Sequence, residues 1–425
     1  MPYKRKVIFT SRNLLDVKSN IYPNMFDGRD KVGDAYRSSF QMYIIMNLLI
    51  TLQNIMKILI IPTNKIHRNG VTNVIFNYLK ALPLEDMQID IVSVNDPEQQ
   101  YKEEVSRHGG QIYVIPRNAN CLFKRLGALK SLIQKNHFDI VHIHGNSHTV
   151  VLELLSAKAA GCGVRIVHSH SSSCTHMFVS KILTPLFNKL YTHALTCGNA
   201  AGLWMFGKRN FKVINNGVDT VKFAFNNKIR QVLREKYQWT DTKVIGHVGN
   251  FVPVKNQQFI VEVFNVLYKK DPSYRLLLIG DGGLRSQTEK HVDDLGLQNV
   301  VTFTGSINNV NEYLNAMDII LMPSLFEGLP LSLIEQQANG LQCVVSDAIS
   351  TECDKSGNIK FLSIKQPVEL WAKEIDTFLD KKNRAERSKK AIESISQKGY
   401  SIQKEAIKLR DYYLNATKKN LCSKN

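Results

Sequence analysis

Two glutamates flank the expected start of a helix in the segment LMPSLFEGLPLSLIEQQANG, residues 321–340. An apolar strand comes first, a loop with proline, serine and glycine follows, and Pro330 suits the first turn of a helix. The first N–H groups of a helix have no partner within it and carry a partial positive charge. The sequence therefore predicts an anion site at the backbone N–H groups of Gly328, Leu329 and Leu331.

The two carboxylates of this segment differ in position. Glu327 lies in the loop ahead of the helix, whereas Glu335 lies about a turn and a half inside it. Glu335 shares a helix face with Leu331 and Ala338, and a carboxylate on an apolar face needs a polar partner. The hydroxyl groups of a ligand would serve. An ordinary buried helix with one paired glutamate explains this segment equally well when it is taken alone.

Two further loops in the same half of the chain suit phosphate groups. Asn250 and Lys255 follow one apolar strand, and the lysine can supply a point charge. Gly280, Asp281 and Gly282 follow the next strand, where glycines allow a ligand to approach the backbone closely. A solvated lysine or a plain turn explains each loop by itself. Together the three loops predict a nucleotide diphosphate site, in which a carboxylate accepts two hydrogen bonds from a ribose.

Four histidines end two neighbouring strands in the first half of the chain: His142, His144, His168 and His170. Residues at i and i+2 share a face of a strand, so we expect the imidazoles to converge at one edge of a sheet. Such a set would suit zinc, but no carboxylate or cysteine in the segment completes an open catalytic site. We therefore expect packing or substrate contacts and no metal. His170 is best placed to meet a ligand, and Gly70, before a helix, offers a lesser contact.

Apolar periodicity places these loops in an α/β fold. From Met56 onward, short apolar strands alternate with helices, which indicates parallel sheets covered on both faces. A turn signal near residue 220 separates two such series, so we expect two doubly wound halves that face an interdomain cleft. The expected parts are an N-terminal domain at 56–222, a C-terminal domain at 223–400, a returning helix at 402–415 and an irregular basic tail at 416–425.

Composition narrows the class of protein. With 425 residues, 44% hydrophobic and 22% charged, the chain is long enough for two globular domains. Seven dispersed cysteines without a CxxC pair argue for reduced thiols in a cytosol. The net charge of +18 suits phosphate-bearing substrates or peripheral contact with an anionic membrane. We expect no nucleic-acid partner, because no binding motif or aromatic cluster accompanies the charge.

Residues 1–55 differ from the rest of the chain. They begin with basic and polar residues and then give YIIMNLLITL at 43–52, about half the length that spans a bilayer. The polar stretch before this run is too long for a standard signal peptide. Two interpretations stay open: a spurious extension upstream of a true start at Met56, which we favour, or a helix that lies weakly in a membrane interface.

The glutamate segment resembles a family signature. EGLPLSLIE, from Glu327 to Glu335, resembles the E-x7-E motif of retaining glycosyltransferases of family four, of the exopolysaccharide and capsule type. Gly70 and His170 are similar to the glycine of the family's first loop and to its active-site histidine. Three further segments resemble family motifs in the same order: VINNGVDTVKF (213–223), GNFVPVKN (249–256) and IGDGGLR (279–285). The resemblance covers residues 56–400 and implies the GT-B fold, with two Rossmann-like domains.

The resemblance implies a reaction. A sugar would pass, with retention, from a nucleotide-diphosphate donor, expected to be a UDP-sugar, to a growing lipid-linked bacterial surface polysaccharide. The implied location is the cytoplasm, at the inner face of the cytoplasmic membrane. No metal or other cofactor is implied.

The resemblance also assigns roles to residues. Lys255, Asn250 and the helix end would hold the leaving diphosphate, and Glu335 would hold the ribose. Glu327 and the neighbouring amides of the helix end would hold the donor sugar. His170 would contact the donor sugar or the acceptor near the reacting centre. Lys255, Glu327 and His170 are thus the expected catalytic residues.

Asn250 departs from the family motif, which has arginine after the glycine. Asparagine can donate a hydrogen bond to a phosphate but brings no charge, and this would cost about 1–3 kcal/mol of binding. Arg285 or a nearby lysine would have to compensate. Two other functions on the same architecture stay open, a sugar-nucleotide epimerase or phosphorylase and a non-catalytic nucleotide-sugar binder.

Overall fold

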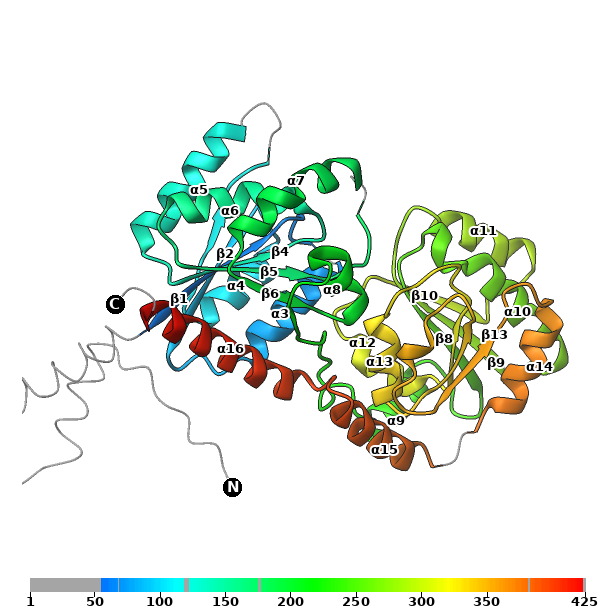
Figure 1. The fold of residues 1–425 in the computed structure, drawn as a ribbon. Coiled ribbons are helices and arrows are strands. Elements are labelled where there is room, and N and C mark those ends of the chain that lie inside the picture. The colour runs from blue at the N-terminus through cyan, green and yellow to red at the C-terminus, as the bar shows by residue number, and fades with distance from the viewer. Residues whose placement is uncertain (1–54, 68, 118–121, 175–176, 381–382, 423–425) are drawn as a thin grey trace, which may run out of the picture. The chain divides into compact units, whose positions relative to one another are not determined.

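The structure is a computed structural model that describes residues 55–425, except for 68, 118–121, 175–176, 381–382 and 423–425 (Figure 1). The predictions for the N-terminal extension therefore lie outside the described residues, apart from Ile55. Within the described part of the chain, no helix combines the length and the apolar character needed to cross a membrane.

The first sheet has seven parallel strands, in the spatial order β3-β2-β1-β4-β5-β6-β7. Isoleucine and valine fill the central strands, because helices cover both faces of the sheet and both sets of side chains are buried. The strands are β1 (Met56–Pro62), β2 (Met87–Ser93), β3 (Ile112–Val114), β4 (Ile140–His144), β5 (Val164–Ser169), β6 (His193–Thr196) and β7 (Lys212–Val213).

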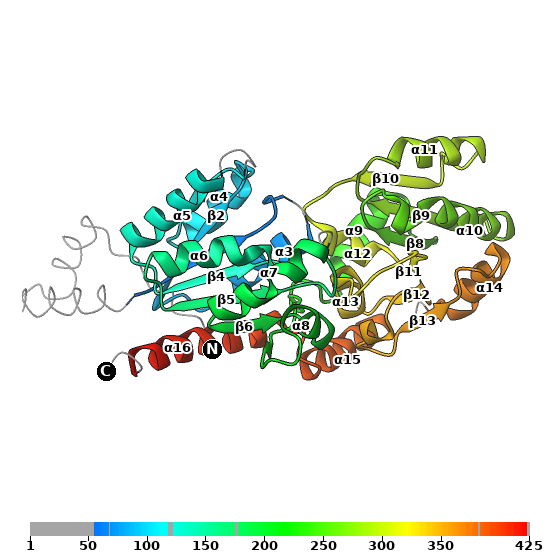
Figure 2. The same cartoon turned by 45° about the horizontal axis from the view of Figure 1, so that its top comes forward.

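Two groups of helices cover the two faces of this sheet (Figure 1; Figure 2). One face packs against α3 (Gly70–Ala81), α4 (Gln99–Arg107) and α16 (Ile402–Cys422). The other packs against α5 (Leu122–Asn136), α6 (Val151–Ala159), α7 (Met177–Leu190) and α8 (Asn199–Phe206), with the short 3-10 helix η2 (His148–Val150) before α6.

The second sheet has six parallel strands, in the order β10-β9-β8-β11-β12-β13. Its strands are β8 (Lys243–Val248), β9 (Tyr274–Ile279), β10 (Val301–Gly305), β11 (Ile319–Met322), β12 (Gln342–Ser346) and β13 (Ile359–Leu362). Its helices are α9 (Asn227–Lys236), η3 (Pro253–Lys255), α10 (Gln257–Lys270), α11 (Arg285–Asp294), α12 (Val310–Ala316), α13 (Leu331–Ala338), η4 (Thr351–Cys353), α14 (Val368–Phe378) and α15 (Arg384–Gln397).

Both sheets are doubly wound, as the sequence predicted. The strand order reverses between β1 and β4 in the first sheet and between β8 and β11 in the second. Loops leaving neighbouring strands at such a reversal diverge to opposite faces and leave a crevice at the carboxyl ends, where ligands bind. The reversal in the second sheet falls between the loops that carry Lys255 and Glu327.

The sequence patterns did not predict α4, α8 or β13, nor the short helices η3 and η4. Helix α4 is short and mostly polar, with only Tyr101 and Val105 as buried apolar residues, and α8 is apolar with little periodicity. Strand β13 is short and only half-buried. In addition, α16 continues to Cys422, beyond the expected end at residue 415, and Ala416 extends its buried stripe.

Candidate functional site

An ion pair lies at the strand reversal of the second sheet. Lys255 ends η3 in the loop after β8, and its Nζ contacts the Oε1 of Glu327, in the loop after β11. A backbone hydrogen bond of 2.8 Å from the N–H of Leu325 to the carbonyl of Val254 joins the same two loops. Only 16% of the Lys255 side chain and 18% of the Glu327 side chain are exposed, so both charges are partly desolvated. Partly desolvated charges act strongly on a phosphate or a sugar hydroxyl.

The glycine loop after β9 packs tightly on the loop after β8. A Cβ on Gly280 would lie 2.0 Å from the carbonyl oxygen of Gly249, and one on Gly282 would lie 2.6 Å from that of Phe251. Both glycines also have positive φ, at 138° and 155°. They are therefore needed to bring the loops together, a role that the sequence did not reveal. Their contact with a ligand stays a prediction, as does that of Asp281, which is exposed beside them.

The start of α13 offers unpaired backbone donors. The structure shows no hydrogen bond from the N–H groups of Gly328, Leu329 or Leu331 to any described residue. A Cβ on Gly328 would meet nothing within 4 Å, so neither packing nor backbone conformation requires glycine there. The open space suits the close approach of a ligand. Pro330 is the N-cap rather than the first helical residue, and its φ of −70° still leads into the helix.

Glu335 lies inside α13 and is largely desolvated. Burial raises the pKa of its carboxyl group to about 7, and Lys222 opposes this shift. Its side chain has no hydrogen-bond partner among the described residues. A carboxylate in such a position is stabilised when a ligand donates hydrogen bonds to it.

Asn250 brings no charge to the carboxyl edge of the second sheet, and Arg285 does not supply the positive charge that is missing there. The Asn250 side chain is exposed and has no hydrogen bond among the described residues. The Arg285 guanidinium donates to Glu289 at 2.7 Å and lies 3.6 Å from Asp281. Because two carboxylates already neutralise Arg285, compensation for Asn250 would have to come from a rearrangement or from another lysine.

The four histidines of the first sheet converge, as the sequence predicted. The rings of His144 and His170 stack with centroids 5.0 Å apart, and those of His142 and His168 with centroids 5.4 Å apart. Burial lowers the pKa of each imidazole, so the cluster is neutral. Three of them, His142, His144 and His168, place nitrogens within 4.8 Å of one another. The planes of His142 and His168 are 4° from parallel, and the Nδ1 of His142 lies 2.7 Å from the hydroxyl oxygen of Tyr413. The expectation that this set holds no metal stays a prediction.

His170 stands at the open end of this cluster, directly after β5. Its Nε2 lies 2.8 Å from the Nδ1 of His144, and its backbone N–H donates to the side chain of Asn146 at 2.7 Å. Burial lowers its pKa to about 4, so the ring is neutral at physiological pH. Its Nδ1 is buried without a close hydrogen-bond partner among the described residues, and the side chain of Asn216 opposes the lowering of the pKa. Gly70, in the same half of the chain, begins α3 and has open space around its Cα, which suits the predicted ligand contact.

His247 was missed by the sequence analysis. It is fully buried near the end of β8, its Nδ1 donates to the carbonyl of Leu321 at 3.0 Å, and burial lowers its pKa to about 4. A Cβ on Gly249 would lie 3.1 Å from its Nε2 and 3.3 Å from the Cε of Lys255. His247 thus supports the backbone under Lys255. Its place at a strand end, like that of His170, was the signal that could have revealed it.

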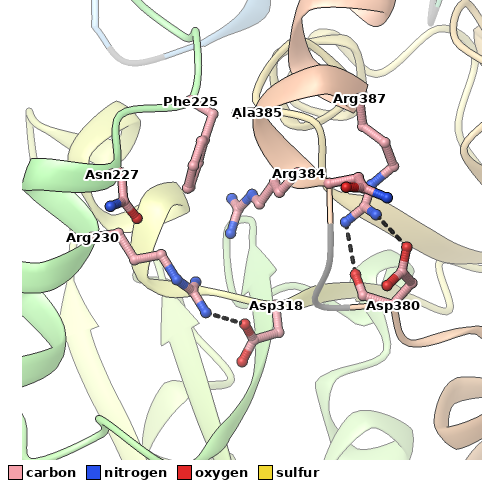
Figure 3. A pocket seen from close by; sticks show the side chains of 9 residues that line it. Phe225, Asn227, Arg230, Asp318, Asp380, Arg384, Ala385 and Arg387 are labelled. Carbon is pink, nitrogen blue, oxygen red and sulfur yellow. Dashed lines mark hydrogen bonds and ion pairs between the residues drawn. The ribbon is translucent and has the colours of Figure 1, made fainter.

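A separate cavity of about 400 Å³ lies beside Asp318, which precedes β11, and so at the amino ends of the strands (Figure 3). Its charged side chains already have partners: Arg230 pairs with Asp318, and Arg387 pairs with Asp380. Arg384 is buried and donates to carbonyl groups at the end of α12. These contacts hold α12 and α15 together, and none of these groups needs a ligand.

Comparisons with known proteins agree with the sequence signature. The family described as Glycosyltransferase Family 4 matches residues 68–222, and that described as Glycosyl transferases group 1 matches residues 229–395. The glycosyltransferase EpsF of Bacillus subtilis is 29% identical over 373 residues, which cover 83% of this chain and 95% of EpsF. The Escherichia coli UDP-Gal:alpha-D-GlcNAc-diphosphoundecaprenol alpha-1,3-galactosyltransferase is 26% identical over 375 residues, 82% of this chain and 94% of that enzyme.

The fold has a close counterpart among solved structures. The crystal structure of Anabaena HepE in complex with UDP superposes with a TM-score of 0.69 at 16% identity, covering 85% of this chain and all of HepE. With the paired family matches, this shows that the chain belongs to glycosyltransferase family four, group 1, and has the GT-B fold. The protein is a glycosyltransferase, as the E-x7-E resemblance implied.

Proposed function

We propose that this glycosyltransferase moves a hexose or N-acetylhexosamine, with retention, from a UDP-sugar to a growing lipid-linked saccharide of a bacterial surface polysaccharide. The transfer takes place on the cytoplasmic side of the membrane. The observation that carries the proposal is the Lys255–Glu327 pair beside the open start of α13.

The second sheet supplies the donor site in this proposal. Lys255 and the N–H groups at the start of α13 bind the diphosphate, where a cation and a helix end together favour an anion. Asn250 donates a further hydrogen bond. Glu335 accepts two hydrogen bonds from the ribose, and Glu327 accepts one from the donor sugar. The ion pair with Lys255 orients the Glu327 carboxylate and so supports this contact.

The first sheet supplies a neutral group near the reacting carbon. His170 is held by His144 and Asn146 and keeps Nδ1 for a sugar hydroxyl. Because its pKa is about 4, it acts as a hydrogen-bonding group rather than as a cation. Gly70 leaves room for the sugar or the acceptor at the start of α3.

The chemistry needs no protein base. The bond from the anomeric carbon to the diphosphate oxygen breaks, and the acceptor oxygen forms a new bond on the same face. The acceptor hydroxyl gives its proton to the departing diphosphate. Lys255 and the α13 N–H groups stabilise the charge that develops on this leaving group. Such stabilisation is usually the largest single contribution to the rate enhancement of an enzyme.

The polysaccharide acceptor is supported by relatives rather than by a contact in this chain. The Escherichia coli relative is named for a galactosyl transfer to a diphosphoundecaprenol-linked sugar, and a Staphylococcus aureus relative for capsular polysaccharide biosynthesis. The UDP donor is supported by the UDP complex of HepE.

A thermal-shift screen of nucleotide sugars on the full chain tests the donor, followed by a transfer assay with a lipid-linked acceptor. The true donor should stabilise the protein by RT ln(1 + [L]/Kd), about 2.7 kcal/mol at a hundredfold excess over Kd. Lys255→Met should abolish most of that shift. A donor that is epimerised without an acceptor would contradict the proposal, and so would tight binding with no transfer across a panel of acceptors.

A further inference from the structure

The helices α5, α6 and α7 lie on one face of the first sheet (Figure 1; Figure 2). Together they form a surface whose exposed charges are all positive. Their exposed charged residues are all lysines: Lys124, Lys130, Lys135, Lys158, Lys181 and Lys189. The single carboxylate on these helices is Glu153, which is buried and paired with the buried Arg125 at 3.0 Å. The structure shows no ion pair for these six lysines among the described residues.

The opposite face of the same sheet has mixed charge. There Lys80 and Arg107 pair with Glu104, Lys408 pairs with Glu405, and Arg410 pairs with Asp86. General solubility would produce such a mixture on both faces. The absence of exposed carboxylates on α5, α6 and α7 therefore points to an anionic partner for that surface.

The same surface also exposes large apolar side chains. Of the fifteen large apolar residues that are exposed in the described chain, eight lie on these three helices. Phe178 and Ile182, which are 77% and 61% exposed, share a face of α7, and Phe123 on α5 is 87% exposed. The inward face of α7 is buried through Ser180, Phe187 and Leu190. Phe178 and Ile182 are therefore on the outward face, where contact with water normally favours polar residues.

These apolar residues lie at a particular end of the sheet. Helices α5 and α7 follow β3 and β5, so their first turns lie at the carboxyl edge of the sheet, as His170 does. Phe123 and Phe178 are the second residues of their helices. The apolar groups are therefore at the edge where the acceptor is proposed to react, and the lysines continue along the helices behind them.

We propose that α5, α6 and α7 dock on an anionic lipid bilayer, with the apolar residues of the first turns in the interface and the lysines over the headgroups. Nucleic acid would match the charge and stack on the phenylalanines, but it would leave the exposed aliphatic side chains, such as Ile182 and Leu186, without an apolar partner. A second copy would place lysine against lysine, because the surface has no exposed carboxylate. Lipid satisfies both features, since acyl chains accept the apolar groups and phosphates accept the lysines.

Flotation of the full chain with vesicles tests this surface directly. Vesicles of phosphatidylcholine with phosphatidylglycerol should bind the protein, vesicles of phosphatidylcholine alone should bind it weakly, and high salt should release it. The triple variant Lys124→Gln/Lys181→Gln/Lys189→Gln should lower the partition coefficient about fivefold per lysine, the equivalent of about 1 kcal/mol each. The double variant Phe178→Ser/Ile182→Ser should lower it roughly tenfold or more, because each side chain loses its burial in the interface.

Matched controls separate this surface from general charge and hydrophobicity. Lys228→Gln/Lys290→Gln/Lys389→Gln removes the same charge from exposed positions near the second sheet, and should leave binding unchanged. Val221→Ser/Val232→Ser removes apolar groups that are 78% and 64% exposed and should do the same. All variants keep residues 1–55, so any anchoring by that segment is common to them.

Three outcomes would overturn the proposal. Equal binding by the surface variants and the wild type would place membrane contact elsewhere in the chain. Wild-type protein that ignores anionic vesicles but dimerises through Phe178 would identify a protein interface. Binding to single-stranded RNA, lost in the lysine triple variant while vesicle binding is not, would identify a nucleic-acid surface. The proposal deepens the proposed function, and because flotation involves no sugar transfer, the two can fail independently.

Discussion

The carboxyl edges of the two sheets share a topology and differ in charge. The first edge carries four histidines whose pKa values are lowered by burial, and they are neutral. The second carries the Lys255–Glu327 ion pair, the desolvated Glu335 and an open helix start. A nucleotide diphosphate is charged and a sugar hydroxyl is not. This difference in charge supports the proposed arrangement, in which the nucleotide binds at the second edge and the neutral reacting partner at the first.

Among the substitutions considered, loss of Glu327 should have the largest effect on activity. An unchanged activity would mean that the second edge is not the donor site. Glu327→Ala should lower kcat/KM about 10²–10³-fold, because it removes a donor-sugar contact and leaves Lys255 without its carboxylate. The melting temperature should change little, because the pair lies at a partly exposed loop. Glu386→Ala, at an exposed glutamate of α15, is the control and should retain full activity. Wild-type turnover by Glu327→Ala would contradict the donor site.

Replacement of His170 tests whether the first edge acts without binding the nucleotide. His170→Ala should lower kcat by roughly ten- to hundredfold, through one lost hydrogen bond near the reacting carbon, and leave the Kd for UDP unchanged. Calorimetry with UDP and steady-state kinetics measure the two quantities. His137→Ala, at an exposed position in the loop after α5, serves as the control. A large rise in the Kd for UDP would mean that the two edges do not divide the work in this way.

Glu335 should make nucleotide affinity depend on pH. Its pKa of about 7 in the unliganded protein means that roughly half of the molecules hold a neutral carboxyl group at neutral pH. Ribose hydroxyls donate to the carboxylate, so binding favours the charged form and affinity should fall as the pH falls through 7. From pH 8 to pH 6 the expected loss is about tenfold.

The control for this pH effect is Glu335→Gln, which cannot titrate. Calorimetry with UDP on both proteins cancels the titration of UDP itself, because that titration is common to both. If the two proteins show the same pH profile, Glu335 does not contact the ribose.

Introduction of arginine at position 250 should have the smallest effect on UDP binding among these substitutions. It would increase the difference in charge between the carboxyl edges of the two sheets. Asn250 is exposed, and the arginine of the family motif would add a charge-assisted hydrogen bond to the diphosphate. We expect Asn250→Arg to strengthen UDP binding about fivefold, since an exposed ion pair contributes about 1 kcal/mol. Asn250→Gln tests side-chain length alone. Weaker binding by the arginine variant would show that another group already occupies the phosphate position.

Much of the fold could be predicted from local sequence. Short apolar runs between amphipathic helices indicated two doubly wound sheets, and the structure has both. Elements with a weak apolar signal were missed: α4 has only two buried apolar residues, and α8 is apolar without a clear period. The three loops that carry Lys255, Gly280 and Glu327 predicted a nucleotide site because each follows a strand of one parallel sheet, and the structure brings Lys255 and Glu327 together.

Long-range packing determines the contacts and the charge states of these residues. Only the tertiary structure joins Lys255 to Glu327 and buries Glu335 enough to raise its pKa to about 7. It also stacks the four histidines in the interior, where burial lowers their pKa values and keeps them neutral. It also gives Gly280 and Gly282 a packing role and places α16 against the first sheet. Sequence determines which groups are present and which strand ends carry them. Their charge states depend on desolvation, and desolvation is set by neighbours that are distant in the chain.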